Sequence, residues 1–119
     1  MKKLLIASTI TVLTLTSVVS TPEVKAANIA QSICEYVAAD DKKRMRSFLK
    51  TNKLKIRRIF DGIECNGQNL LEFASAIGSV ETGSLMISRL PKSVVSENLA
   101  ILQTGSKPLI DAANKRVSS

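Results

Sequence analysis

The chain has 119 residues, with 17 lysine and arginine residues against 10 aspartate and glutamate residues, two cysteines and no histidine, and its formal net charge is +7. A chain of this length forms one small domain. Without histidine it lacks the usual general base of serine and cysteine hydrolases, and two cysteines alone are too few for a tetrahedral zinc ion. We therefore expect a protein that is not an enzyme and that binds no metal or cofactor.

The N-terminus has the pattern of an export signal. A short cationic start precedes a mostly apolar stretch from Leu4 to Val19, and Val24-Lys25-Ala26 then forms a cleavage site before Ala27. The alternative is a membrane anchor, but the serine and threonine residues in the stretch make it too polar for a spanning helix of about 20 residues. We expect a signal peptide over residues 1–26.

Removal of this leader leaves one helical domain over residues 27–119, in the periplasm or secreted, with no transmembrane span. In an oxidising compartment the simplest arrangement of Cys34 and Cys65 is a disulfide with each other. Closing the loop between them would stabilise the fold by about 3–4 kcal/mol. Two buried free thiols are the alternative.

Helical periodicity organises the first half of the domain. Apolar residues recur at helical spacing between Ala27 and Ala39. Asp40-Asp41 can end that helix and cap the next, because an aspartate side chain accepts hydrogen bonds from the free N–H groups of a helix start. The next helix, Lys42 to Lys50, has one apolar and one cationic side. Leu54 to Ile63 is predicted to be a partly buried extended or short helical connector.

Turn and breaker residues divide the second half into further helices. Asn66-Gly67 is a turn signal that leads into a short apolar helix, and Gly78 suits the left-handed position that ends it. Pro91 ends the helix that follows, and Gly105 ends the next one. The predicted helices of this half are Leu70–Ile77, Ser79–Leu90, Ser93–Leu102 and Lys107–Lys115, with residues 117–119 frayed.

A weak internal repeat relates parts of this pattern at an offset of about 38 residues, as read from the sequence. The segments Gly67–Ala74 and Gly105–Ala112 both read Gly-x-x-apolar-Leu-x-x-Ala. This motif resembles the helix-opening segment of ankyrin-type repeats, although Asn69 stands where that family has threonine. We expect an all-α fold of stacked helix–turn–helix pairs, and the ankyrin-type motif suggests that these pairs are degenerate ankyrin-like repeats. A small irregular helical bundle is the alternative.

A second resemblance covers most of the domain. Ile33 to Ala74 contains an early cysteine, an Asp-Asp/Lys-Arg helix and a Cys-Asn-Gly-x-x-Leu-Leu-x-Phe-Ala box. With these marks the chain resembles the DUF3718 family of small exported bacterial proteins. The resemblance implies export in a Gram-negative bacterium and a role outside central metabolism. It supplies no catalytic residues, because the family's function is not established.

The strongest chemical feature is a cationic stretch without acidic residues. It forms a candidate anion-binding face, which consists of Lys42, Lys43, Arg44, Arg46, Lys50, Lys53, Lys55, Arg57 and Arg58. Such a face attracts anions through long-range fields that salt screens. The plainer interpretation is a solvated surface that keeps the protein soluble. Nucleic acid is not an expected partner, because an exported protein does not meet the nucleic acid of the cytoplasm and because the stretch has one aromatic residue, Phe48, where base stacking uses several.

The acidic residues offer weaker candidates. Asp40-Asp41 suits a helix cap better than a metal site, and Asp61 with Glu64 lacks the ligand density of a calcium loop. The leading interpretation is a non-enzymatic binding or structural protein of the cell envelope, whose partners are anionic envelope components or an acidic protein. The alternatives are an inhibitor or stress-response partner of an acidic envelope protein, and a small hydrolase. The oligomeric state is not predictable from these features.

Overall fold

The computed structural model of the protein describes residues 22–119. Residues 1–21 lie outside this range, and with them most of the predicted signal peptide. Residues 22–119 form eight α-helices and one 3-10 helix, without a β-strand. The elements are α1 (Pro22–Ala38), α2 (Lys42–Thr51), α3 (Ile56–Ile59), η1 (Phe60–Gly62), α4 (Leu70–Ile77), α5 (Val80–Arg89), α6 (Lys92–Glu97), α7 (Leu99–Leu102) and α8 (Lys107–Ser118).

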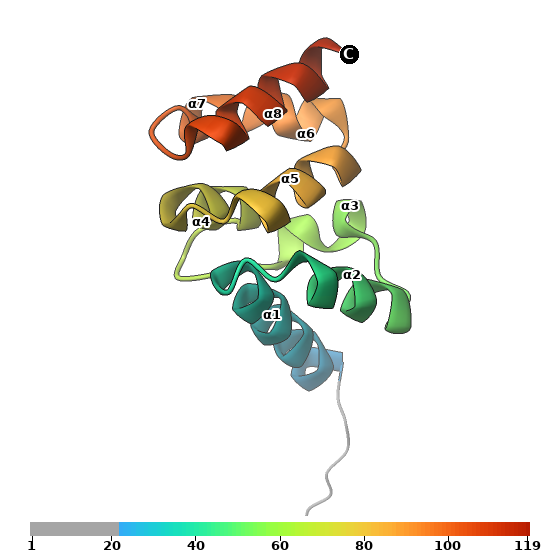
Figure 1. The fold of residues 1–119 in the computed structure, drawn as a ribbon. Helices are drawn as coiled ribbons and strands as arrows, with labels where there is room; N and C mark the ends of the chain where they lie inside the picture. The colour runs from blue at the N-terminus through green and yellow to red at the C-terminus, as the bar shows by residue number, and fades with distance from the viewer. Residues whose placement is uncertain (1–21) are drawn as a thin grey trace, which may run out of the picture.

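The helices stack as antiparallel pairs in three layers (Figure 1). The first layer is α1 with α2, the second is α4 with α5, and the third is α6 and α7 with α8. Between layers, α1 contacts α4 and α2 contacts α5, and on the other side α7 contacts α4 and α8 contacts α5. The short α3 and η1 lie between the first two layers and join them. The predicted all-α architecture of stacked helix–turn–helix pairs is therefore confirmed.

The first two layers share the same turn at the same positions of the repeat. At the end of α1, Asp41 N donates to Tyr36 O at 2.8 Å, and at the end of α4, Ser79 N donates to Ala74 O at 2.8 Å. The residue before each donor has a positive φ, 52° at Asp40 and 77° at Gly78. This is the Schellman turn that commonly ends helices. Donor and acceptor of the second hydrogen bond each lie 38 residues after those of the first, which is the offset of the sequence repeat.

The two turns also bind one another. The Asp40 carboxylate, at the end of α1, accepts hydrogen bonds from Thr82 N at 2.8 Å and Thr82 Oγ1 at 3.1 Å. In return, Ser79 Oγ donates to Val37 O. The prediction that Asp40-Asp41 caps a helix is confirmed for Asp41, which accepts from Arg44 N at the start of α2. Asp40 caps α5 of the next layer instead, because the stacking brings that helix start to it.

Close backbone approach joins the third layer to the second. Ser106 N donates to Ser75 Oγ at 3.1 Å, and a Cβ atom on Gly105 would lie only 1.7 Å from that same oxygen. Asn69 Nδ2 donates to Asn98 Oδ1 at 2.8 Å. Gly105 is therefore required for packing against α4, in addition to ending the helix before it.

The first helix begins at Pro22, five residues before the predicted start at Ala27. In the second half of the chain, two predicted helices differ from the structure because long-range contacts override the local pattern. Instead of one helix from Ser93 to Leu102, the chain forms α6 from Lys92 and a separate α7, and Ser93 is not a cap. Asn98 divides them, since its side chain both donates to Val94 O and accepts from the second layer. The last helix also runs to Ser118 rather than fraying. Arg116 Nη2 holds its end by donating to Leu90 O at 3.0 Å.

The core is mainly aliphatic, as the composition predicts. Its fully buried side chains come from every layer and include Ile33 and Met45 from the first, Leu71 and Met86 from the second, and Leu109 from the third. Burial of an aliphatic side chain of this size contributes about 1.5–3 kcal/mol. One continuous core therefore holds the three layers together as a single domain.

Candidate functional site

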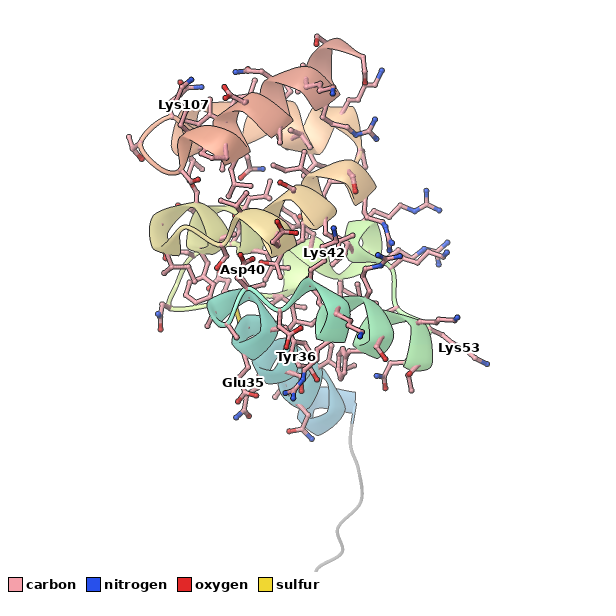
Figure 2. The ribbon with its side chains drawn as sticks, viewed as in Figure 1. Glu35, Tyr36, Asp40, Lys42, Lys53 and Lys107 are labelled. Carbon is pink, nitrogen blue, oxygen red and sulfur yellow. A yellow bond between two sulfur atoms is a disulfide. The ribbon has the colours of Figure 1, made fainter. Side chains whose placement is uncertain are left out.

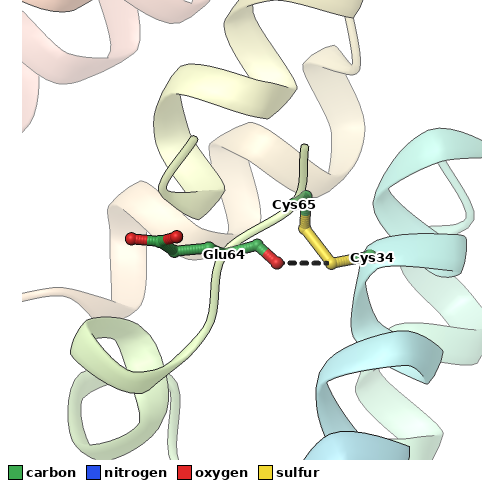
Figure 3. Close-up of a disulfide and its surroundings, with 3 residues drawn as sticks. All are labelled: Cys34, Glu64 and Cys65. Carbon is green, nitrogen blue, oxygen red and sulfur yellow. Dashed lines mark hydrogen bonds between the residues drawn. A yellow bond between two sulfur atoms is a disulfide. The ribbon is translucent and has the colours of Figure 1, made fainter. Parts of the chain in front are cut away.

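A disulfide joins the first layer to the connector before α4 (Figure 3). Cys34 of α1 and Cys65 are bonded with an S–S distance of 2.05 Å and a Cα–Cα distance of 5.7 Å, which confirms the predicted pairing. Cys34 Sγ also lies 3.6 Å from the Glu64 carbonyl oxygen. The covalent link fixes the segment that carries α3 and η1 against α1.

Cys65 stands at the mouth of a two-residue turn. Cys65 and Gln68 exchange both backbone hydrogen bonds, at 2.8 and 3.0 Å, across Asn66 and Gly67. Both central residues have positive φ values, 55° and 74°, as a type I′ turn requires. The turn reverses the chain directly into α4, where Asn69 and Glu72 form a capping box. The sequence Cys-Asn-Gly thus ends the disulfide-bonded connector and starts the second layer.

The cationic stretch runs along one side of α2 and continues through α3. In α2, Met45 and Leu49 are 0% and 2% exposed, and the charged side chains point the other way. In the next segment, Ile56 and Phe60 are buried at i and i+4, which leaves the basic residues between them in solvent. Figure 2 shows nitrogen-tipped side chains gathered at the side of the molecule where α2, α3 and the end of α5 lie, with Lys53 at one edge.

A groove of about 730 Å³ opens between these elements. We call it the basic groove. Its lining residues come from α2, from the α2–α3 loop and, in the second layer, from the end of α5. Five of its eight lining residues are cationic and none is acidic; the lining is Arg46, Ser47, Leu49, Lys50, Lys53, Leu54, Lys55 and Arg89. Among the residues that the structure describes, none of the five cations forms an ion pair.

The nine residues of the predicted face do not all reach this groove. Four of them line it: Arg46, Lys50, Lys53 and Lys55. Arg57 lines an adjoining hollow of about 270 Å³ together with Lys55 and Arg89. Arg58 lies on neither surface.

At the other end of α2, acidic residues balance the predicted face. Lys42 Nζ lies 3.7 Å from Glu81 Oε1, and Arg44 Nε lies 3.4 Å from Asp41 Oδ2. Lys43 lines a separate hollow with Glu81, and Arg46 lines both this hollow and the basic groove. Within the described residues, the cations without an ion pair therefore extend from the middle of α2 through the following loop into α3.

Arg89 is the groove residue that sequence reasoning missed. It lies in the last turn of α5, more than 30 positions beyond the cationic stretch. A cation in the last turn of a helix is ordinarily explained by the helix dipole. Its place in the groove follows only from the packing of α5 against α2 and α3.

A family model described as "Protein of unknown function (DUF3718)" matches residues 33–97, which is more than half of the chain. The chain belongs to the DUF3718 family. No curated protein and no solved structure matches it. The DUF3718 match runs from α1 into α6, so both cysteines and every residue of the basic groove lie inside the family segment.

Lys53 has an unusual backbone conformation within this DUF3718 segment. Leu54 N donates to Leu49 O at 2.8 Å, so α2 ends in the same Schellman turn as α1 and α4. The left-handed position of that turn is filled by Lys53, with a φ of 55°. Glycine is the usual residue there, since a side chain in this conformation costs about 1–2 kcal/mol.

Four acidic side chains of this DUF3718 protein have partners that stabilise helices. Asp40 and Asp41 cap helices, Glu72 belongs to the capping box, and Asp111 lies 3.5 Å from Lys107 Nζ. Among residues 22–119, no group of three histidine, cysteine, aspartate or glutamate residues gathers in a way that would hold a metal ion. No helix in the same range has the length and apolar character needed to cross a membrane.

Proposed function

We propose that the protein is a non-enzymatic binding protein of the cell envelope that uses the basic groove and the surface around it to hold anionic partners. The observation that supports this proposal is the concentration of five cations in one groove whose lining has no acidic residue, and none of the five forms an ion pair within residues 22–119. Like charges so placed repel one another, and a bound anion relieves that repulsion.

The disulfide supports the envelope as the place of action. Disulfides persist in oxidising compartments such as the periplasm and are rare in the cytosol, where thiols are kept reduced. The N-terminal sequence has the pattern of an export signal, which agrees with this location. The polyanions available there are lipid headgroups, the phosphates of surface glycolipids and acidic proteins. The second candidate partner is an acidic envelope protein, because the same cations would attract its carboxylates. In that case the protein would act as an inhibitor by binding the acidic protein at the groove.

Binding to vesicles tests the proposal directly. The protein with its disulfide intact is mixed with phosphatidylglycerol vesicles or with neutral phosphatidylcholine vesicles and sedimented at low and at high salt. We expect binding to the anionic vesicles only, weakening steeply as salt increases, because screening shortens the reach of exposed charges. The proposal is rejected if the protein sediments equally with both kinds of vesicle. It is also rejected if the protein binds neither kind and does not bind an acidic polypeptide in a separate assay.

A further inference from the structure

We infer that the basic groove is a phosphate-recognition site for a ligand that carries two or three phosphate groups close together. This inference deepens the proposed function and rests on it, because it assumes that the groove binds anions at all. The phosphates can belong to a free molecule or to a lipid headgroup. In both cases the same cations would recognise them.

The concave shape favours a compact ligand over a flat charged surface. At about 730 Å³ the groove falls within the range of roughly 300–1,000 Å³ that is typical of small-molecule sites. A convex cationic face would suffice to hold the protein on an anionic membrane. In the groove, cations from α2, from the following loop and from the end of α5 line one hollow, so a single compact phosphorylated group can contact several of them.

The charge of the groove matches several phosphates. Five cations line it, and a phosphate monoester carries about −1.5 to −2 at neutral pH, so two or three phosphates balance the five charges. Two of the cations, Arg46 and Arg89, carry planar guanidinium groups that bind phosphate oxygens in pairs. They come from different layers of the fold, so each of the first two layers contributes one such phosphate-binding group to the groove.

The backbone of Lys53 is an independent observation that points to the groove. Three helices end in the same turn, with Asp40, Lys53 and Gly78 in the left-handed position. Gly78 adopts it without strain, and Asp40 uses its side chain to cap α5. The Lys53 side chain has no hydrogen-bond or ion-pair partner among the described residues, and it lines the groove. Strain that no internal contact compensates is typical of residues kept for binding.

Calorimetry of the intact protein with three soluble probes tests the ligand class. Tripolyphosphate should bind at least tenfold more tightly than orthophosphate, because each additional charge-assisted contact is worth roughly that factor. A glutamate oligomer whose length matches the charge of tripolyphosphate supplies that charge as carboxylates and should bind more weakly. Binding of this oligomer as tight as tripolyphosphate binding would overturn the phosphate assignment and favour an acidic protein as the partner.

Vesicles distinguish a lipid source from a free one. Phosphatidylcholine vesicles that contain a bisphosphorylated glycolipid are compared with phosphatidylglycerol vesicles of equal total charge. Preferential binding to the bisphosphorylated lipid indicates a headgroup ligand. Tight tripolyphosphate binding without that preference indicates a free phosphorylated ligand. Both results support the inference. The inference is overturned if the protein prefers clustered phosphates neither in a lipid headgroup nor in a free molecule.

Three variants that each remove one positive charge test whether the groove is the binding site. Arg89→Gln and Lys50→Gln remove one groove cation each, and Arg58→Gln removes one from the surface outside the groove. We expect a loss of tripolyphosphate affinity of roughly tenfold for the first two and of no more than about twofold for the control. Equal losses in all three, with salt-dependent vesicle binding intact, would reject the groove but keep the proposed function. Failure of the wild-type protein to bind any polyanion would reject both.

Discussion

Asp40 Oδ1, at the end of the first helix of one layer, accepts hydrogen bonds from both the backbone N–H and the hydroxyl group of Thr82 in the next layer. Thr82 is fully buried, so its hydroxyl group has no access to water. The backbone of Asp40 therefore belongs to the turn that ends α1, while its carboxylate caps α5 of the next layer and satisfies a buried polar group. Figure 2 shows Asp40 in this position, between the end of α1 and the start of α5.

Replacing Asp40 by glycine separates the two roles of this residue. The Asp40→Gly variant relieves the left-handed backbone conformation but loses the cap and leaves the Thr82 hydroxyl group unpaired. Because loss of a cap costs about 1 kcal/mol and an unpaired buried hydroxyl about 1–3 kcal/mol, we expect a net loss of about 1–2 kcal/mol in the free energy of unfolding. Urea unfolding measures it. Asp40→Asn, which keeps an acceptor oxygen, should lose less; equal loss in both variants would contradict this account.

The same substitution at Lys53 should have the opposite sign. Lys53 has the same backbone conformation, but its side chain forms no hydrogen bond or ion pair with another described residue, so Lys53→Gly should raise the free energy of unfolding by about 1 kcal/mol. It should also weaken tripolyphosphate binding. Lys53→Gln keeps the strain and removes only the charge, so it should lose affinity without gaining stability. A Lys53→Gly variant that is less stable than the wild-type protein would show that the side chain serves the fold.

Local signals in the sequence were sufficient for the elements that local contacts determine. The apolar spacing of α1, α2 and α4, the Asp41 cap and the Gly78 turn all depend on residues within one or two helical turns. The cysteine pairing was accessible for another reason, because a short chain with two cysteines allows only one intramolecular bond. The repeat at 38 residues was also readable, since stacking layers need equivalent turns.

The remaining features depend on contacts between residues far apart in the chain. The break at Asn98 depends on its bond to Asn69, and the extension of α8 depends on Arg116 reaching Leu90. The basic groove was only partly predictable. A run of lysine and arginine residues identifies a charged surface, but whether it is flat or hollow depends on how α5 brings Arg89 beside α2.

Gly105 provides a test of the contact between the second and third layers. A methyl group at this position would lie 1.7 Å from Ser75 Oγ and 3.1 Å from Ser75 O, so Gly105→Ala must push α4 away from the loop between α7 and α8. We expect a loss of about 1–3 kcal/mol, with the thermal midpoint lowered by about 4–8 °C per kcal/mol.

Gly62→Ala is the matched control, because nothing lies within 4 Å of a Cβ atom there. It should change the midpoint little or raise it slightly, since alanine restricts the unfolded chain. Similar effects at both glycines would mean that the layers separate without cost, contrary to the packing seen here.

The disulfide should contribute stability without shaping the groove. Cys34→Ser with Cys65→Ser removes a cross-link over a sequence separation of 31 residues, and we expect a loss of about 3–4 kcal/mol in urea unfolding. Reductant should destabilise the wild-type protein by a similar amount and leave the double variant unchanged. Mass measurement after alkylation should find no free thiol in the untreated wild-type protein.

The groove should survive in the folded double variant, because Ile56 and Phe60 still bury the α3 segment in the core and α3 still packs on α5. Undiminished affinity for tripolyphosphate would show this, whereas lost affinity in a folded variant would make the disulfide a positioning element of the site.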